Sequence, residues 1–248
     1  MKRIILLFTL SCWTAMAAWC QNSQTTVDSA ELIVDRYIKI LNFDAIKSDS
    51  MLYIESRITH RSSPNDTIIL KRWYLAPYSY RTELWHKDTL TFGLLTNGRT
   101  THKRLKEGEK KWEDVSISNY MDDFPGYDFH GPFAHYKVMG WAMEYQGVWD
   151  MNGHKVYRIF VQAPRRYDRY YLFEKETNLL FLIDEKDTYD PSNTLVEGSH
   201  VDWRAYHEYT PKGACIFPTI ESYQYEGEIT TMHSQVTYLP IDESLFLK

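Results

Sequence analysis

The sequence predicts an α+β domain in which one amphipathic helix precedes an antiparallel meander of strands. In residues 28–42, apolar side chains recur at intervals of three and four, which is the spacing of one helix face. From residue 51 onward, short segments rich in β-branched and aromatic residues alternate with turn signals. No helical pattern separates successive hairpins, and this argues against parallel βαβ units.

The predicted helix has a single apolar face. Asp28 or Ser29 can cap its start, and Glu31 follows Asp28 by three residues, as in a capping box. The helix therefore needs a surface against which to bury its apolar side. The apolar positions are Ala30, Ile33, Val34, Tyr37, Ile38 and Leu41.

The strands are predicted as a series of hairpins. The Asn97-Gly98 pair is a strong signal for a tight turn, and Pro211-Lys212-Gly213 predicts another turn near the end of the chain. The first half has predicted strands at 51–61, 67–75, 79–86, 89–96 and 100–105. The second half has them at 142–151, 154–162, 169–174, 179–184, 199–209, 216–225 and 229–239.

Residues 116–140 interrupt this pattern with Asp, Gly and Pro residues that fit no regular period. We expect an irregular insert with short helices over 117–123 and 133–138. Gly126, Gly131 and Gly140 could serve as hinges if the insert is a lid. The insert can equally be a fixed plug that completes the core, or an ordinary crossover.

The first twenty residues read as an export signal, with Lys2 and Arg3 before an apolar stretch. Cleavage could follow Ala17 or Cys20, and the remainder, 21–248, is predicted to be one domain. Cys20 also raises the alternative of an acylated outer-membrane lipoprotein. Trp19 stands where a lipoprotein signal requires a small residue, so we favour a periplasmic product without the anchor.

The charge balance and the cysteine content argue against two classes of protein, nucleic-acid binders and disulfide-stabilised domains. The chain has 28 basic and 33 acidic residues, and its mean hydropathy is -0.47. An acidic balance argues against nucleic-acid binding. Two of the three cysteines lie in the leader, so Cys215 cannot form an intramolecular disulfide and is predicted to be a buried thiol.

Catalytic and cofactor motifs are missing from the sequence. It contains no nucleophile elbow, phosphate-binding glycine loop, dinucleotide fingerprint or zinc-protease motif. The nine histidines are scattered, and the acidic residues show no spacing that identifies a catalytic pair. The sequence thus predicts no enzyme activity, no cofactor and no metal site.

Aromatic residues are abundant, with 19 Tyr, 11 Phe and 8 Trp. Several fall on consecutive predicted hairpins, where strand alternation would direct some inward and some outward. One interpretation is a wide sheet whose concave face lines an apolar ligand cavity. The alternative is that the aromatic side chains fill a β-core and cover its faces.

The order of motifs over 128–246 resembles that of the LolA-like outer-membrane lipoprotein-sorting family. The resemblance includes an acidic-aromatic-x-Gly-Pro insert followed by a Tyr-Lys pair, a Gly-x-x-x-Tyr strand, an acid-x-x-Thr turn, a Gly-x-x-Phe-Pro strand and a closing tail. The corresponding segments are Asp128-Phe129-His130-Gly131-Pro132-Phe133, Tyr136-Lys137, Gly153 to Tyr157, Glu174 to Thr177, Gly213 to Glu221 and Pro240 to Phe246.

The resemblance implies an incomplete, strongly curved antiparallel β-barrel, or half-barrel, with helices across its concave side. Family members of known role shelter lipid or lipoprotein acyl chains there without chemical conversion. The function implied is acyl-chain binding or carriage by a monomer in the Gram-negative envelope, with room for a membrane-bound delivery or receptor protein. The candidate cavity residues are Trp73, Tyr80, Trp85, Phe92, Phe129, Phe133 and Tyr136.

Two other functions remain open at this stage. One is an envelope stress sensor on the same fold that docks a membrane protein. The other, less favoured, is a glycan or lipid hydrolase, which would need converging carboxylates or a nucleophile in the cavity.

Overall fold

The computed structural model describes most of the predicted strands and the predicted N-terminal helix. The described residues are 29–46, 49–75, 79–97, 102–105, 111–114, 133, 136–137, 140–151, 153–162, 168–184, 201–225 and 227–247. The predicted export signal, the predicted helix over 117–123 and most of the 116–140 insert lie outside these ranges. Within them, no helix is long and apolar enough to cross a membrane.

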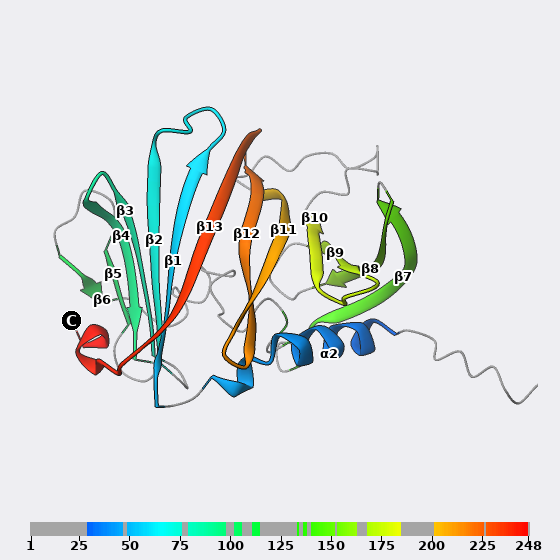
Figure 1. Cartoon of the computed structure of the whole chain (residues 1–248), viewed down its shortest axis with the longest axis horizontal. Coiled ribbons are helices and arrows are strands. Elements are labelled where there is room, and N and C mark those ends of the chain that lie inside the picture. The colour runs from blue at the N-terminus through cyan, green and yellow to red at the C-terminus, as the bar shows by residue number, and fades with distance from the viewer. Residues whose placement is uncertain are drawn as a thin grey trace, which may run out of the picture.

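Thirteen strands in the described part of the chain form one antiparallel sheet. Its order is β6-β5-β4-β3-β2-β1-β13-β12-β11-β10-β9-β8-β7 (Figure 1). Two meanders are therefore joined where β1 pairs with β13, from Met51 opposite Leu239 to His60 opposite Thr230. The described edge strands β6 and β7 do not pair with each other, so the sheet stays open.

The strand bounds agree closely with the predicted segments. The first meander comprises β1 (Met51–His60), β2 (Thr67–Leu75), β3 (Ser79–His86), β4 (Thr89–Thr96), β5 (His102–Leu105) and β6 (Glu113–Asp114). The second comprises β7 (Ala142–Met151), β8 (His154–Gln162), β9 (Arg169–Glu174), β10 (Leu180–Asp184), β11 (Val201–Lys212), β12 (Cys215–Tyr225) and β13 (Glu228–Leu239).

The predicted fold class is confirmed: the protein has an open, curved antiparallel sheet with one N-terminal helix. Two local expectations were wrong. The short strand β6 was not predicted, and the turn expected to begin at Pro211 lies further on, because Pro211 still pairs with Ile216 in β11. Of the helix expected over 133–138, the described residues Phe133, Tyr136 and Lys137 lie in turns.

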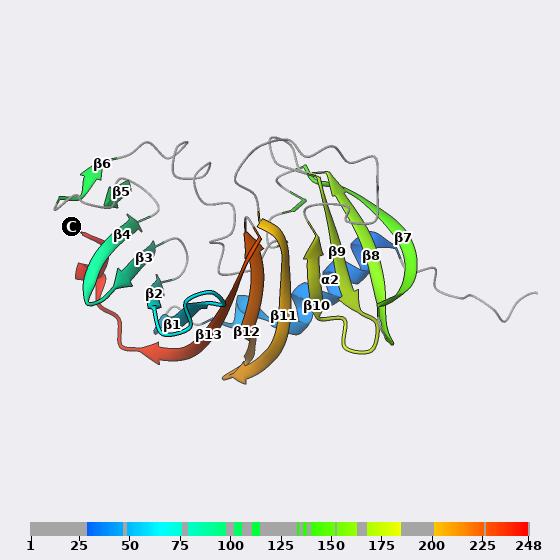
Figure 2. The same cartoon turned by 90° about the horizontal axis from the view of Figure 1, so that it is seen from above.

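The sheet has two faces that differ in what covers them. Figure 2 shows the sheet curving around the side on which the helix α2 (Ala30–Leu41) lies, with the C-terminal turn η2 (Glu243–Phe246) on the outer side. We call these sides the concave face and the convex face. Because successive side chains of a strand point to opposite faces, Leu52 belongs to the concave face and Met51 to the convex face, in agreement with the two buried clusters that they join.

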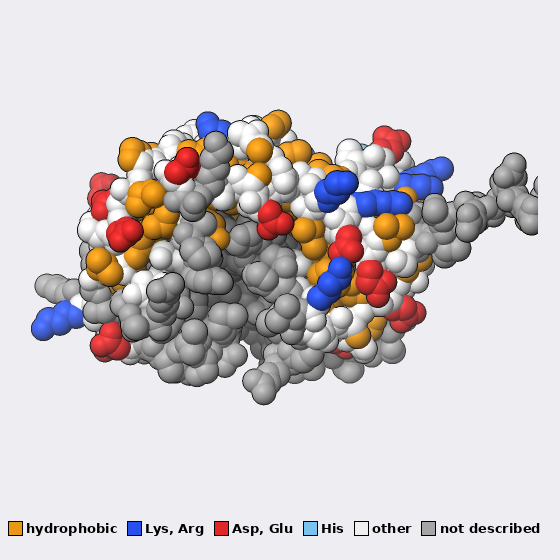
Figure 3. All heavy atoms as spheres, turned by 90° about the horizontal axis from the view of Figure 1, so that it is seen from below, with side chains coloured by type: hydrophobic (Ala, Val, Ile, Leu, Met, Phe, Trp, Pro, Cys, Tyr) orange, Lys and Arg blue, Asp and Glu red, His pale blue; other side chains and the backbone are white. Residues whose placement is uncertain are grey.

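Helix α2 forms where its apolar periodicity predicts, and it packs on the concave face. Ser29 caps it, since its side-chain oxygen accepts a hydrogen bond from the Leu32 amide at 3.2 Å. Asn42 ends the helix in a left-handed conformation, with φ of 54°. Its inner residues Ala30, Ile33, Val34, Tyr37 and Leu41 are buried. Figure 3 shows acidic and basic side chains mixed over its outer surface.

On the convex face, the C-terminal turn covers a separate apolar cluster. Phe246 is buried with Met51, Leu75 and Leu95. The Trp112 ring lies so close to Gly93 that a Cβ atom there would stand 2.8 Å or less from two of its ring carbons. Position 93 must therefore be glycine if the Trp112 indole is to approach β4 this closely.

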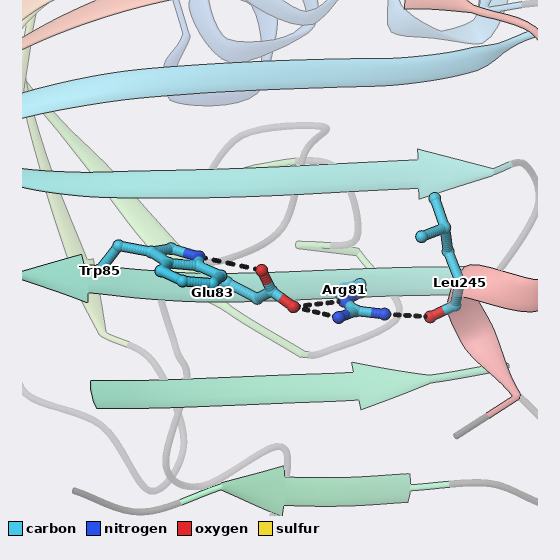
Figure 4. Close-up of polar contacts among 4 residues, drawn as sticks. All are labelled: Arg81, Glu83, Trp85 and Leu245. Carbon is cyan, nitrogen blue, oxygen red and sulfur yellow. Dashed lines mark hydrogen bonds and ion pairs between the residues drawn. The ribbon is translucent and has the colours of Figure 1, made fainter. Parts of the chain in front are cut away.

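A buried ion pair lies beside this cluster, on β3. The Arg81 guanidinium contacts the Glu83 carboxylate, and both side chains are about 5% exposed. Arg81 also donates to the Leu245 carbonyl at 2.8 Å, while the Trp85 indole donates to the other Glu83 oxygen at 2.9 Å (Figure 4). The pair thereby attaches the C-terminal turn to the middle of the first meander.

Replacing Glu83 with Ala should lower the free energy of unfolding by about 3–5 kcal/mol, because the Arg81 charge would stay buried without its counter-charge. Urea denaturation of the two proteins measures the difference. Glu176, an exposed turn carboxylate, is the matched control, and its replacement with Ala should change stability by less than about 0.5 kcal/mol. Equal stabilities for Glu83→Ala and Glu176→Ala would contradict this role of the ion pair.

Candidate functional site

The concave face is the candidate site, and its aromatic part is centred on Phe133. This side chain is fully buried. Its ring centroid lies 4.6 Å from that of Tyr171, 5.7 Å from that of Phe173 and 6.3 Å from that of Tyr37. These are edge-to-face and tilted contacts of the kind that stabilise aromatic clusters. Phe133 thus joins α2, β9 and the end of the insert in one apolar cluster.

The same end of the insert is attached to α2 by polar contacts. The Tyr136 hydroxyl donates to Asp35 Oδ1 at 3.0 Å, and Lys137 Nζ approaches Asp35 Oδ2 at 3.1 Å. Burial, followed by its hydrogen bond to Asp35, raises the pKa of Tyr136. Hydrogen bonds to Tyr136 and Asp35 raise the pKa of Lys137. The ammonium therefore stays charged at neutral pH and fixes this part of the insert on the helix.

A polar band borders the aromatic cluster across β11 and β12. Arg204, Tyr206 and Glu221, which is only 5% exposed, lie close enough to influence one another's ionisation. The Tyr206 and Tyr209 rings stack at 6.2 Å. Burial raises the pKa of Tyr37, Tyr206 and Tyr209 above the ordinary value, so their hydroxyls remain neutral donors and acceptors.

Beyond the polar band, the concave face carries an aliphatic cluster across β1, β2 and β13. Ile58, Leu70 and Met232 are buried together, and Ile68 and Leu84 are half-buried beside them. The strand registers place these side chains on one face, since Ile58 lies opposite Ile68 and Leu70 lies opposite Leu84. The concave side thus presents aromatic and aliphatic regions separated by tyrosine and charged groups.

The structure does not bring the seven predicted cavity residues together. Phe133 and Tyr136 meet in the aromatic cluster. Tyr80 and Phe92 lie on the concave face further along the sheet, where their partners are Tyr74 and Leu84. Residue Phe129 lies outside the described residues.

Trp73 and Trp85 lie on the convex face instead. Trp73 packs beside Arg81, whose guanidinium carbon is 5.5 Å from the indole centroid. Trp85 has Lys71 Nζ at 5.2 Å from its ring. The physical reason is strand alternation: each Trp follows or precedes a concave residue, Tyr74 or Leu84, and must point the other way.

Sequence reasoning missed most residues of the second meander that form the site. Their positions were predicted as strands, but they were not assigned to the concave face. A signal existed in the sequence of β8, where the apolar residues Tyr157, Ile159 and Val161 recur at the spacing of two that marks one face of a strand, and all three join the concave cluster. The residues not proposed as cavity residues are Tyr37 on α2 and, on the second meander, Tyr171, Phe173, Arg204, Tyr206, Tyr209 and Glu221.

No protein-family profile and no curated protein sequence matches the chain, but solved structures share its fold. A LolA superfamily protein from Nitrosomonas europaea matches with a TM-score of 0.56 at 12% identity, over 89% of this chain and 98% of that one. A DUF1329 family protein from Desulfovibrio piger also gives 0.56 at 12% identity, over 88% and 97%. A domain from Vibrio parahaemolyticus named for outer membrane lipoprotein sorting gives 0.53 at 10% identity, over 88% and 94%. The chain therefore has a LolA-like fold.

Stability should fall above pH 10 because of the buried tyrosines. Their pKa values are raised in the folded state, so the stabilisation is complete below the unfolded-state pKa of about 10 and is lost as the pH rises toward the folded-state value. Urea midpoints measured between pH 8 and about 11.5 should show this decline. Tyr37→Phe should reduce its slope, and an unchanged slope in that variant would contradict the assignment.

Proposed function

We propose that this protein binds a lipid or lipoprotein acyl group on its concave face and carries it within the cell envelope without chemical conversion. The observation that carries the proposal is the open, curved sheet whose inner face holds apolar clusters on both meanders. The LolA-like fold supports the same proposal. The export signal predicted from the sequence agrees with an envelope location.

Acyl chains suit the physical character of this face. Burying hydrocarbon gains about 0.8 kcal/mol for each CH₂ group, so a long chain supplies affinity without specific hydrogen bonds. Ile68 and Leu84 are half-buried and offer apolar area on the first meander. The polar band of Arg204, Tyr206 and Glu221 supplies hydrogen-bonding groups for the polar end of such a ligand.

Two adjacent isoleucines on β2 provide a matched test of which face binds. Ile68 lies on the concave face, opposite Ile58, whereas Ile69 lies on the convex face, opposite Arg57. Both are half-buried. Ile68→Glu places a charge on the proposed acyl site, and Ile69→Glu places the same charge on the other side of the same strand.

Ile68→Glu should weaken uptake of a fluorescent fatty acid and of a triacylated lipopeptide by at least about tenfold, because a buried carboxylate disfavours hydrocarbon contact. Ile69→Glu should bind both probes as the unsubstituted protein does. Circular dichroism at the assay temperature establishes that both variants are folded. Equal uptake by the two folded variants, or no uptake by the unsubstituted protein, would sink the proposal.

A further inference from the structure

Strands β12 and β13 pair over only part of their length. Their ladder runs from Tyr225 opposite Glu228 to Ile220 opposite His233. Beyond this point, residues 234–239 of β13 pair with β1 alone, and Figure 1 shows the two strands diverging toward their lower ends. We call the space between 234–239 and 215–219 the split.

Pro218 and a register shift mark the place where the split begins. The pairing of β11 with β12 shifts between Glu208 opposite Ile220 and Tyr209 opposite Pro218. A bulge bends its strand and increases the local twist. Proline donates no backbone hydrogen bond, so it is found at strand edges and bulges. The sequence of β12 thus favours its departure from β13 at this point.

The split is closed on the concave side and at its lower end. The Phe43 ring packs against that of Phe217 at 5.1 Å on the concave side. Asn42 Nδ2 donates to the Ala214 carbonyl at 2.9 Å, and the Tyr238 hydroxyl donates to the Lys212 carbonyl at 3.4 Å. The split therefore opens on the convex face, as a groove of about 680 Å³.

One wall of this groove is an open strand edge. Alternate residues of a strand direct both their N–H and C=O groups toward the same neighbour. About half of residues 234–239 therefore direct backbone donors and acceptors away from β1 and into the groove, and no described strand pairs with them there. Such an edge is a template for an added strand.

Two acids and two bases line the groove, and they differ in whether another described side chain already contacts them. Both acids have donors within the chain: Glu55 accepts from the Tyr53 hydroxyl at 2.5 Å, and Glu208 accepts from Thr210 at 3.4 Å. The bases Arg57 and Lys212 are exposed, and among the described side chains neither forms an ion pair. Arg57 lies opposite His233, where the pairing of β12 with β13 ends and the split begins. Lys212 lies at the opposite end of the split, next to the turn between β11 and β12.

We propose that this groove binds an extended acidic segment of a partner protein. The segment pairs with the open edge of β13 and places carboxylates against Arg57 and Lys212. About six residues of extended chain, roughly 20 Å, match the length of the free edge. Because the groove and the proposed acyl site lie on opposite faces of the sheet, the protein can hold a ligand and a partner segment at the same time.

The test uses a fluorescein-labelled peptide of about eight residues, alternating Thr and Val as in a strand, with an Asp near each end. Fluorescence anisotropy should show binding to the purified protein, and binding should be at least about tenfold weaker for a peptide with Asn at both Asp positions. The double variant Arg57→Glu/Lys212→Glu should lose a similar factor. Lys155→Glu, an exposed strand lysine on β8, is the control and should bind normally.

Hydrogen exchange separates strand pairing from simple charge attraction. The peptide should slow exchange of amides within 234–239, while uptake of the fluorescent fatty acid stays unchanged in the double variant. Failure of the acidic peptide to bind, normal binding by the double variant, or protection confined to another part of the sheet would overturn the proposal. A dimer in sedimentation velocity that the double variant dissociates would also overturn it, by assigning the groove to a second copy.

Discussion

The pairing of β1 with β13 is the constraint on which the rest of the structure depends. It joins strands that lie at opposite ends of the described chain, and it turns two meanders into one sheet. A buried hydroxyl contact accompanies it, with Ser56 Oγ 2.7 Å from Ser234 Oγ and Arg72 donating to Ser56 at 3.1 Å. Bringing residues so distant in sequence together closes a long loop, which costs conformational entropy. The apolar clusters packed on either side of the β1–β13 pair supply free energy that compensates for this cost.

The apolar clusters on the two faces stabilise different parts of the sheet. On the concave face, α2 and Phe133 cover the second meander with aromatic contacts, while the first meander contributes aliphatic side chains. On the convex face, the C-terminal turn and the Arg81–Glu83 pair stabilise the first meander from outside. Among the described residues, the stabilising contacts of the first meander thus lie mainly on the convex face, opposite the proposed acyl site.

Local sequence patterns predicted the bounds of the helix and strands better than they predicted which side chains point to which face of the sheet. The helix periodicity of Ile33 and Tyr37 and the hairpin signals predicted α2 and most strands nearly to the residue. Of the predicted cavity residues, Phe133 and Tyr136 meet on the concave face, whereas Trp73 and Trp85 point to the convex face. Both faces of this sheet carry large apolar side chains, so a period of two does not tell which face is concave.

Short length and contacts between distant segments account for the features of the fold that sequence reasoning missed. Strand β6 is two residues long, too short for any alternating pattern. The close approach of Trp112 to Gly93, and the capture of the Leu245 carbonyl by Arg81, join segments that no local rule relates. Pro218 indicates that a strand pairing is interrupted near the split, but a proline alone does not show which neighbouring strand stops pairing.

Native mass spectrometry of the protein, purified gently from the cells that produce it, tests the central claim most directly. The account predicts a bound acyl-containing molecule at one copy per chain, identified by lipid extraction and displaced by the triacylated lipopeptide. A protein that is ligand-free when isolated, and that takes up neither fatty acid nor lipopeptide, would contradict acyl binding on the concave face.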